Sequence, residues 1–279
     1  MFKKILNLSR PRFWMYVFGP YLLGITAARF WEHETSFWIL FLFGIFFLFP
    51  ANIFIYGVND IFDSDTDALN EKKNGYETAP QKHEKRYLVL TIFFSLLPFL
   101  LLYILIEKSF SLPLFFLASF LFFSFFYSAP PLRAKAIPFV DSWFNILYIF
   151  PGFFGYVLSG GEHFSFLLFF AAWCWCIAMH AYSAVPDIAA DKAAGIATTA
   201  TFLQKNKTLW YCFFFYFLSS IFFFLHSGIF AFLLLIPYLF MIFASWRADT
   251  SQKLFRLYTF FPVINTLVGM LLFFFIYFF

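Results

Sequence analysis

Long runs of apolar residues, separated by short polar stretches, are the dominant pattern along this chain. A helix needs about 20 apolar residues to cross a bilayer, and the runs are continuous rather than alternating, which favours helices over the strands of a membrane β-barrel. The predicted spans are roughly 13–30, 36–57, 87–106, 111–127, 139–158, 164–186, 207–225, 229–246 and 255–278. The pattern predicts an all-α membrane protein, with nine transmembrane helices in a single bundle around a lipid-accessible pocket.

The polar stretches between these spans are too short to hold a second, soluble domain in a chain of 279 residues. Lys3 and Lys4 precede the first run, as basic residues precede the apolar part of a signal peptide. However, Trp14 and Pro20 are unusual in a cleaved segment, and no cleavage site follows it. We therefore interpret the first run as a true span and expect one polytopic domain over residues 1–279.

Composition supports the membrane interpretation. Hydrophobic residues make up 62% of the chain and charged residues 12%, against about 45–50% and 25% in soluble domains. A soluble or disordered protein is therefore excluded. The net charge of +4 gives no indication of nucleic-acid binding. The three cysteines all lie in apolar runs, where we expect buried thiols rather than a disulfide framework.

The basic residues are distributed unevenly between the two sides that nine spans would define. Of the 19 lysines and arginines, 17 fall on the side of the amino terminus, and only Arg29 and Lys108 fall on the other. Cytoplasmic loops of membrane proteins carry such an excess of basic residues. We therefore expect a multi-pass protein of the cell (inner or cytoplasmic) membrane, with the N-terminus and the active-site loops in the cytoplasm.

A first acidic cluster follows the second predicted span. If the helix continues, Asp60, Asp63 and Asp67 recur at i, i+3 and i+7 and share one face. Asn59 flanks that face. Carboxylates this close repel one another unless a cation lies between them, and oxygen ligands together with phosphate oxygens suit magnesium. The cluster therefore predicts a magnesium–phosphate site.

Two alternatives to a magnesium site exist for this cluster. The spacing of Asp63, Asp65 and Asp67 is similar to that of a calcium loop, but such a loop requires Gly at its sixth position and Glu at its twelfth. Ala68 and Asn74 occupy those positions, which excludes the loop. A solvated acidic segment, neutralised by nearby lysines, remains as the alternative without a function.

A second acidic pair stands about half the chain length later, at the end of the sixth predicted span. Asp187 and Asp191 are four residues apart and would share a helical face. The pair lies on the same predicted side as the first cluster. This arrangement suggests two similar halves that face each other across a pocket, as in many membrane proteins with internal repeats.

A basic loop lies between the two clusters and runs from Tyr127 to Lys135. Arg133 and Lys135 can bind phosphate oxygens, the arginine with two parallel hydrogen bonds and the lysine as a point charge. The alternative is that these residues only anchor the cytoplasmic side. Asp141 follows the loop and could pair with one of its basic residues.

Together these features predict a specific chemistry. Two magnesium-binding faces and a basic loop would bind a diphosphate and neutralise it as a leaving group. When the diphosphate group leaves an allylic substrate, a carbocation remains. Aromatic rings can shield this cation because their faces attract cations. An apolar pocket suits a lipophilic acceptor. His180 and Tyr182, near the second pair, are candidate bases.

The double motif Asn59-Asp60-x-x-Asp63-x-x-x-Asp67 and Asp187-x-x-x-Asp191 resembles the paired motifs of the UbiA superfamily of membrane prenyltransferases. The basic loop and the nine spans also fit, so the resemblance covers most of the chain. It implies an enzyme that uses Mg²⁺, an allylic diphosphate donor and a lipophilic acceptor in the bilayer. The expected catalytic and metal-binding residues are Asp60, Asp63, Asp67, Asp187 and Asp191, and the expected diphosphate-binding residues are Asn59, Tyr127, Arg133 and Lys135.

Three stretches look like the carotenoid branch of that superfamily, the lycopene elongases: residues 9–20, 56–67, and 186–191 with 195–201. Elongases of this kind add a dimethylallyl unit to lycopene. Two departures from the wider family are Glu71 where proline often follows Asn70, and Lys72-Lys73-Asn74-Gly75 in place of an Arg-Pro run.

These features predict magnesium-dependent elongation of a lycopene-type carotenoid from dimethylallyl diphosphate. Prenylation of an aromatic quinone precursor is the alternative acceptor chemistry. A transporter with acidic sites is the alternative class, although transporter sites gather at mid-depth rather than at span ends. The donor's length, a hydroxylated product and the oligomeric state remain open.

Overall fold

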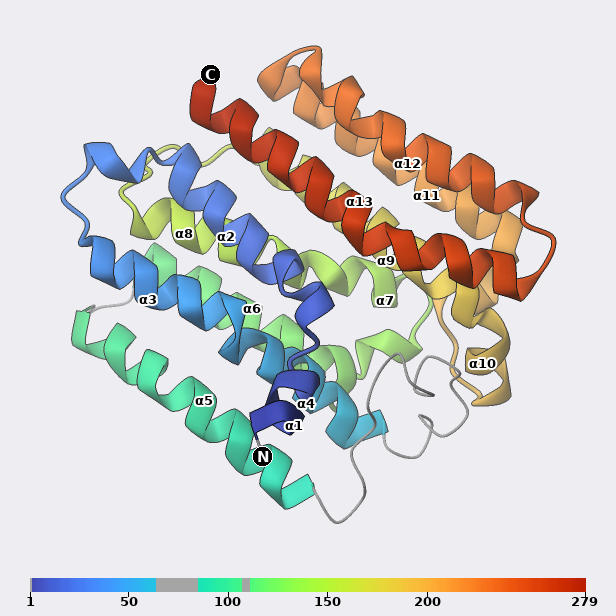
Figure 1. Ribbon diagram of the computed structural model, residues 1–279, viewed down its shortest axis with the longest axis horizontal. Helices are drawn as coiled ribbons and strands as arrows, with labels where there is room; N and C mark the ends of the chain where they lie inside the picture. The colour runs from blue at the N-terminus through green and yellow to red at the C-terminus, as the bar shows by residue number, and fades with distance from the viewer. Residues whose placement is uncertain (1, 64–84, 107–110) are drawn as a thin grey trace. The chain divides into compact units, whose positions relative to one another are not determined.

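The computed structural model describes residues 2–63, 85–106 and 111–279, and every regular element in these ranges is a helix (Figure 1). Within these described ranges, six helical segments are long and apolar enough to cross a membrane. They are Phe37–Phe62, Lys85–Ile106, Phe166–Ala193, Thr199–Ser227, Phe230–Arg247 and Ser251–Phe278. The prediction of an all-α membrane protein is confirmed at this level.

The other three predicted spans also coincide with helical structure. Two are shorter apolar helices, α2 (Met15–Ala27) and α6 (Leu112–Ser128). The third, 139–158, is divided into α7 (Val140–Trp143), the 3-10 helix η7 (Phe144–Tyr148) and α8 (Phe150–Leu158). Pro151 contributes to this division because it has no N–H to bond to the preceding turn. Nine crossings and their orientation stay predictions.

The described chain forms two compact units. Unit 1 comprises Met1–Leu132, Phe150–Glu162 and Phe273–Phe279, and unit 2 comprises Arg133–Ile149 and His163–Leu272. The division passes through the predicted span 139–158. The single domain expected over residues 1–279 stays a prediction.

In unit 1, α2 packs along α8, α8 packs on α6, and α4 (Pro50–Asp63) contacts α5 (Lys85–Ile106) and α6. Glycines allow α2 and α8 to approach each other closely. A Cβ atom added to Gly24 would lie 1.9 Å from the carbonyl oxygen of Gly152. Only glycine fits there, and small residues are a common means by which membrane helices pack closely.

An aromatic cluster fills the interior of the same unit. Phe43, Phe47 and Phe154 are fully buried. The ring of Phe154 lies 4.9 Å from that of Phe43 and 5.4 Å from that of Phe47, both in edge-to-face arrangements. Such pairs add to the stability gained from burial alone. The chain has 52 phenylalanines, and this cluster shows that some of them build the core.

In unit 2, α9 (Phe166–Ala184) packs along α11 (Thr199–Ser227), and α12 (Phe230–Arg247) packs on α11. The ring of Tyr182 on α9 lies 4.6 Å from that of Phe261 on α13 (Ser251–Phe278). Helix α11 is kinked at Gln204, whose φ is 62°. The polar residues 204–207 lie inside this helix, so it begins earlier than the start at residue 207 that the apolar pattern predicts.

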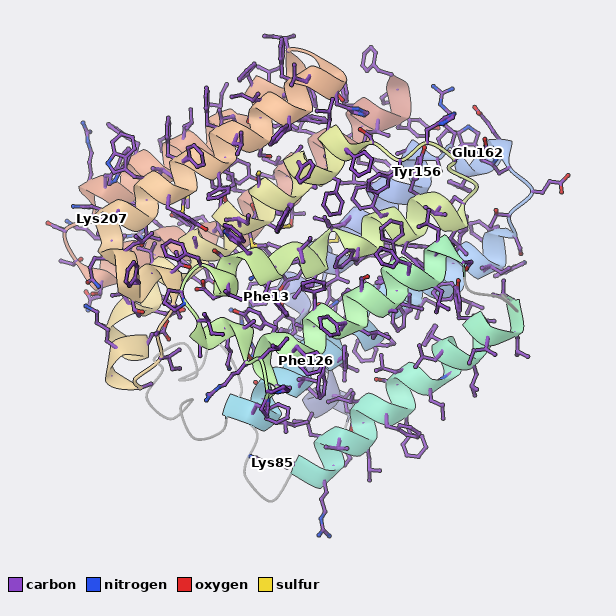
Figure 2. The ribbon with its side chains drawn as sticks, turned by 180° about the vertical axis from the view of Figure 1, so that it is seen from behind. Phe13, Lys85, Phe126, Tyr156, Glu162 and Lys207 are labelled. Atoms are coloured by element: carbon purple, nitrogen blue, oxygen red, sulfur yellow. The ribbon has the colours of Figure 1, made fainter. Side chains whose placement is uncertain are left out.

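Apolar side chains lie both between the helices and on their outward faces. Rings fill the spaces between helices and also cover outward faces of the helices (Figure 2). Phe240 and Phe202, for example, are 66% and 65% exposed. Aromatic side chains with such large exposed fractions are unfavourable in water but suit a lipid environment. The three cysteines are free and buried, as predicted.

Candidate active site

The first acidic motif begins on α4. This helix runs through Asn59 and Asp60 to Asp63, so the predicted continuation beyond the second span is confirmed as far as Asp63. The side chain of Asp63 and all of Asp67 lie outside the described residues. Asp60 is only 1% exposed, and a carboxylate removed from solvent in this way requires a compensating partner.

Arg10 supplies that partner. Its Nη2 atom donates a hydrogen bond of 2.8 Å to Oδ1 of Asp60. The guanidinium also lies over the ring of Tyr56, 4.6 Å from its centroid. The Arg10 side chain is 10% exposed. Tyr56 and Asp60 are one turn apart on α4 and share one face of the helix, so a single arginine contacts both side chains.

The end of α6 is joined to the same helix. The hydroxyl of Ser128 donates to Oδ1 of Asn59 at 3.0 Å, and the Ser128 side chain is buried. This bond fixes which way the Asn59 amide is turned. Tyr127 is the neighbouring residue on α6 and is half-buried. A cis peptide bond joins Pro130 to Pro131 immediately afterwards.

The basic loop continues into unit 2. Arg133 precedes the short 3-10 helix η6 (Ala134–Ala136), which contains Lys135. Lys135 is only 8% exposed, and lysine is rarely buried to this extent unless it is paired. Arg133 has a left-handed backbone with φ 41°, and Arg10 has the same conformation with φ 50°. Such backbones are uncommon outside glycine and gather at functional sites.

The second acidic motif lies where α9 ends. Helix α9 stops at Ala184, a 3-10 turn η8 (Val185–Asp187) follows, and α10 (Ile188–Ala193) contains Asp191. Pro186 in η8 has no N–H to bond back into α9. Asp187 therefore stands at the N-cap position of α10 rather than within one continuous helix. Both carboxylates are half-buried.

Asp141, on α7, is the most deeply buried carboxylate of unit 2 and has an exposed fraction of 0%. Its Oδ2 accepts a hydrogen bond of 2.8 Å from the backbone N–H of Thr199, and its Oδ1 accepts one from the Thr199 hydroxyl. Nε2 of His180 lies 3.9 Å from Oδ2. The sequence suggested that Asp141 pairs with the basic loop, and these contacts are instead made to α9 and α11.

The two candidate bases differ in their surroundings. His180 is 17% exposed and lies beside Asp141. Tyr182 is buried, and its hydroxyl lies 2.8 Å from the Ser245 hydroxyl on α12. A buried hydroxyl held in this way stabilises the packing of α9 against α12.

The chemistry of the motif residues fits a hard cation. They are carboxylates, and the pair Asp187 and Asp191 keeps enough exposure for a magnesium ion that retains several waters. Within residues 2–63, 85–106 and 111–279, no group of three His, Cys, Asp or Glu side chains is placed to hold a metal. The remaining ligands expected by sequence, Asp63 and Asp67, lie outside the described side chains.

Sequence reasoning missed two residues that contact buried carboxylates, Arg10 in unit 1 and Thr199 in unit 2. Arg10 is a charged residue at the start of the first apolar run and lies in the stretch 9–20, which carried a resemblance but no role. Thr199 lies in the stretch 195–201, which carried a resemblance but no role. Both contact carboxylates that are far away in the sequence, which no local pattern indicates.

Comparison with known proteins gives consistent results. The family model of the UbiA prenyltransferase family matches residues 17–278 of this chain. A lycopene elongase/hydratase from Haloarcula japonica is 36% identical over 267 residues, which cover 95% of this chain and 88% of that protein. One from Halobacterium salinarum is 37% identical over 270 residues, which cover 97% of this chain and 95% of that protein.

A solved structure has the same fold. It is that of a UbiA homolog from Archaeoglobus fulgidus bound to GPP and Mg²⁺, with a TM-score of 0.71 and 22% sequence identity. The match covers 98% of this chain and 99% of the homolog.

Proposed function

The chain belongs to the UbiA prenyltransferase family, and from this premise we propose that it elongates a lycopene-type carotenoid with a dimethylallyl group taken from dimethylallyl diphosphate. The observation that carries the proposal is the identity of 36–37% to lycopene elongase/hydratases over 95–97% of the chain. The resemblance of residues 195–201 to the same branch supports it.

In this proposal the acidic residues bind the diphosphate through Mg²⁺. The residues that would hold the metal are Asp60, Asp63, Asp67, Asp187 and Asp191. When bound, magnesium neutralises charge on the diphosphate as the bond to the allylic carbon breaks. One oxygen of Asp60 is already paired with Arg10. We therefore expect Asp60 to contribute less charge to the metal than the other carboxylates do.

The uncharged and basic residues would bind the diphosphate oxygens directly. These residues are Asn59, Tyr127, Arg133 and Lys135. Arg133 has the planar donor group that matches phosphate oxygens. Asn59 has its amide oriented by Ser128. Donors held before the substrate arrives need no reorganisation as charge develops on the leaving group.

The same proposal includes a topology. Nine crossings would place both acidic motifs and the basic loop on the side of the amino terminus, and the basic residues favour the cytoplasm for that side. The diphosphate donor would then enter from the cytoplasm, and the carotenoid would enter from the bilayer.

The test is expression of the chain in bacteria that make lycopene, followed by mass spectrometry of the carotenoids. We expect products longer by one or two five-carbon units, and the mass also reveals whether water is added. Asp187→Asn should abolish them at equal membrane abundance. Unchanged lycopene with folded protein in the membrane would overturn the carotenoid acceptor. Full activity of Asp187→Asn would overturn the role of the second motif.

A further inference from the structure

We propose that Asp141 is a positioning residue for the second acidic motif, because it joins the segment that precedes the motif to the segment that follows it. The motif lies between His180 and Thr199 in the sequence. Both of these residues approach the single carboxylate of Asp141. This inference rests on the proposed function, in which Asp187 and Asp191 bind the diphosphate through magnesium.

Of the two contacts of Asp141, the one with Thr199, which follows the motif in the sequence, is the stronger. Thr199 is the first residue of α11, and both its N–H and its hydroxyl donate to Asp141. The Thr199 oxygen in turn accepts from the backbone N–H of Phe139 at 2.7 Å. Phe139 and Thr199 stand where α7 and α11 begin, so the two helix starts satisfy each other's backbone donors.

The backbone is shaped to make this contact. Phe139 has a φ of 69°, a conformation that costs energy for a bulky residue. The Ser142 hydroxyl donates to the Phe139 carbonyl at 3.0 Å. A strained backbone of this kind persists only where surrounding contacts hold it. The carboxylate of Asp141 is thereby held facing the first turn of α11.

The other contact of Asp141 is with His180 on α9, which precedes the motif in the sequence. Nε2 of His180 lies 3.9 Å from the same Oδ2 atom that accepts the Thr199 N–H. His180 is in the last two turns of α9, before the helix is interrupted at Pro186. The orientation of α9 at this end sets where Asp187 emerges.

The segment between these two contacts is itself compact. Gly195, with φ 68°, follows the end of α10, and the Ile196 N–H donates to the Asp191 carbonyl at 2.8 Å. Lys192 on α10 donates to the Gln204 side chain of α11 at 2.8 Å. With these bonds, a change in position at Thr199 is transmitted to α10. The placement of Asp191 therefore depends on the bond between Asp141 and Thr199.

The experiment measures magnesium binding without turnover. Purified full-length protein in detergent is titrated with Mg²⁺ in the presence of inorganic pyrophosphate, and the rise in melting temperature reports binding. In Thr199→Val, which removes the hydroxyl at nearly constant volume, we expect the midpoint Mg²⁺ concentration to rise about tenfold, as for other residues that orient metal ligands. Thr199→Ser keeps the hydroxyl and should restore the wild-type midpoint.

Thr201→Val is the matched control. Thr201 forms a capping box with Thr198 at the same helix start, and its hydrogen bonds within the described residues do not include Asp141. It should lower the melting temperature without changing the Mg²⁺ midpoint. If Thr199→Val does not fold, Asp141→Asn, which keeps the shape and removes the charge, carries the same prediction.

The outcomes separate this inference from the proposed function. Asp187→Asn should abolish stabilisation by Mg²⁺ and pyrophosphate. If Asp187→Asn is stabilised as the wild type is, the assignment of the motif fails, and the inference fails with it. If Asp187→Asn loses stabilisation but Thr199→Val and Asp141→Asn keep the wild-type midpoint, only the positioning role is overturned. An equal rise in the midpoint with Thr201→Val would also overturn it.

Discussion

The guanidinium of Arg10 and the carboxylate of Asp60 form an ion pair of 2.8 Å in which the arginine side chain is 10% exposed and the aspartate 1%. Neither charge is well solvated, so each depends on the other. The pair joins the segment before α2 to the turn of α4 that begins the first acidic motif. It therefore links the stability of the fold to the placement of a proposed functional carboxylate.

Arg10→Ala should destabilise the protein strongly. Removing one partner of a buried ion pair leaves the other charge uncompensated, at a cost of about 3 kcal/mol. The loss should appear as a lower melting temperature of the protein in detergent. Arg12→Ala is the control, because Arg12 is a nearby exposed residue of the same charge. Equal melting temperatures for the two variants would contradict the structural role of the pair.

Removal of magnesium should stop product formation. Chelation with EDTA should reduce prenyl transfer in isolated membranes to background, and added Mg²⁺ should restore it. Ca²⁺ should restore it poorly, because it prefers longer bonds and more ligands than Mg²⁺ does. The measurement is the incorporation of radiolabelled dimethylallyl diphosphate into extractable lipid. Incorporation that persists under EDTA would contradict the proposed metal dependence.

Gly24→Ala should weaken unit 1. The added Cβ would meet the Gly152 carbonyl oxygen at 1.9 Å, so α2 and α8 would have to separate. Overpacking of this kind costs about 1–3 kcal/mol, measurable as a lower melting temperature. Gly19→Ala is the control on the same helix, because its Cβ would lie 3.8 Å from the Met15 side chain. A loss of stability with Gly19→Ala as large as that with Gly24→Ala would show that the approach to Gly152 is not the cause.

Tyr182→Phe should affect stability more than catalysis. The hydroxyl of Tyr182 is buried against Ser245, and loss of such a bond costs about 1 kcal/mol. A general base would instead contribute about 100-fold or more to the rate. We therefore expect a modest fall in melting temperature and a turnover within about twofold of wild type. Ser245→Ala should destabilise similarly, and a loss of turnover confined to Tyr182→Phe would indicate a role as the base.

The sequence predicted the helical elements well, because a lipid environment requires long apolar helices and the few polar residues mark their ends. It placed the starts and ends less well where the backbone departs from a regular helix. The break between α7, η7 and α8 arises within an apolar run, and the kink at Gln204 occurs inside α11. Hydrophobicity does not reveal such local changes of direction.

For the candidate site, the sequence by itself determined which residues are proposed to carry the chemistry. In so apolar a chain, Asp60, Asp187 and Asp191 stand out because charge in a bilayer is costly and is retained for a reason. Their spacing along the helix followed from the helical period alone.

Only the tertiary structure decided which partners hold the buried carboxylates of Asp60 and Asp141. Arg10 meets Asp60 across 50 positions of the sequence, and Thr199 meets Asp141 across 58. Such pairs depend on how closely helices approach, as at Gly24, and on the direction in which each side chain leaves its backbone. Hydrophobic periodicity specifies the buried face of a helix but not the residue that it meets.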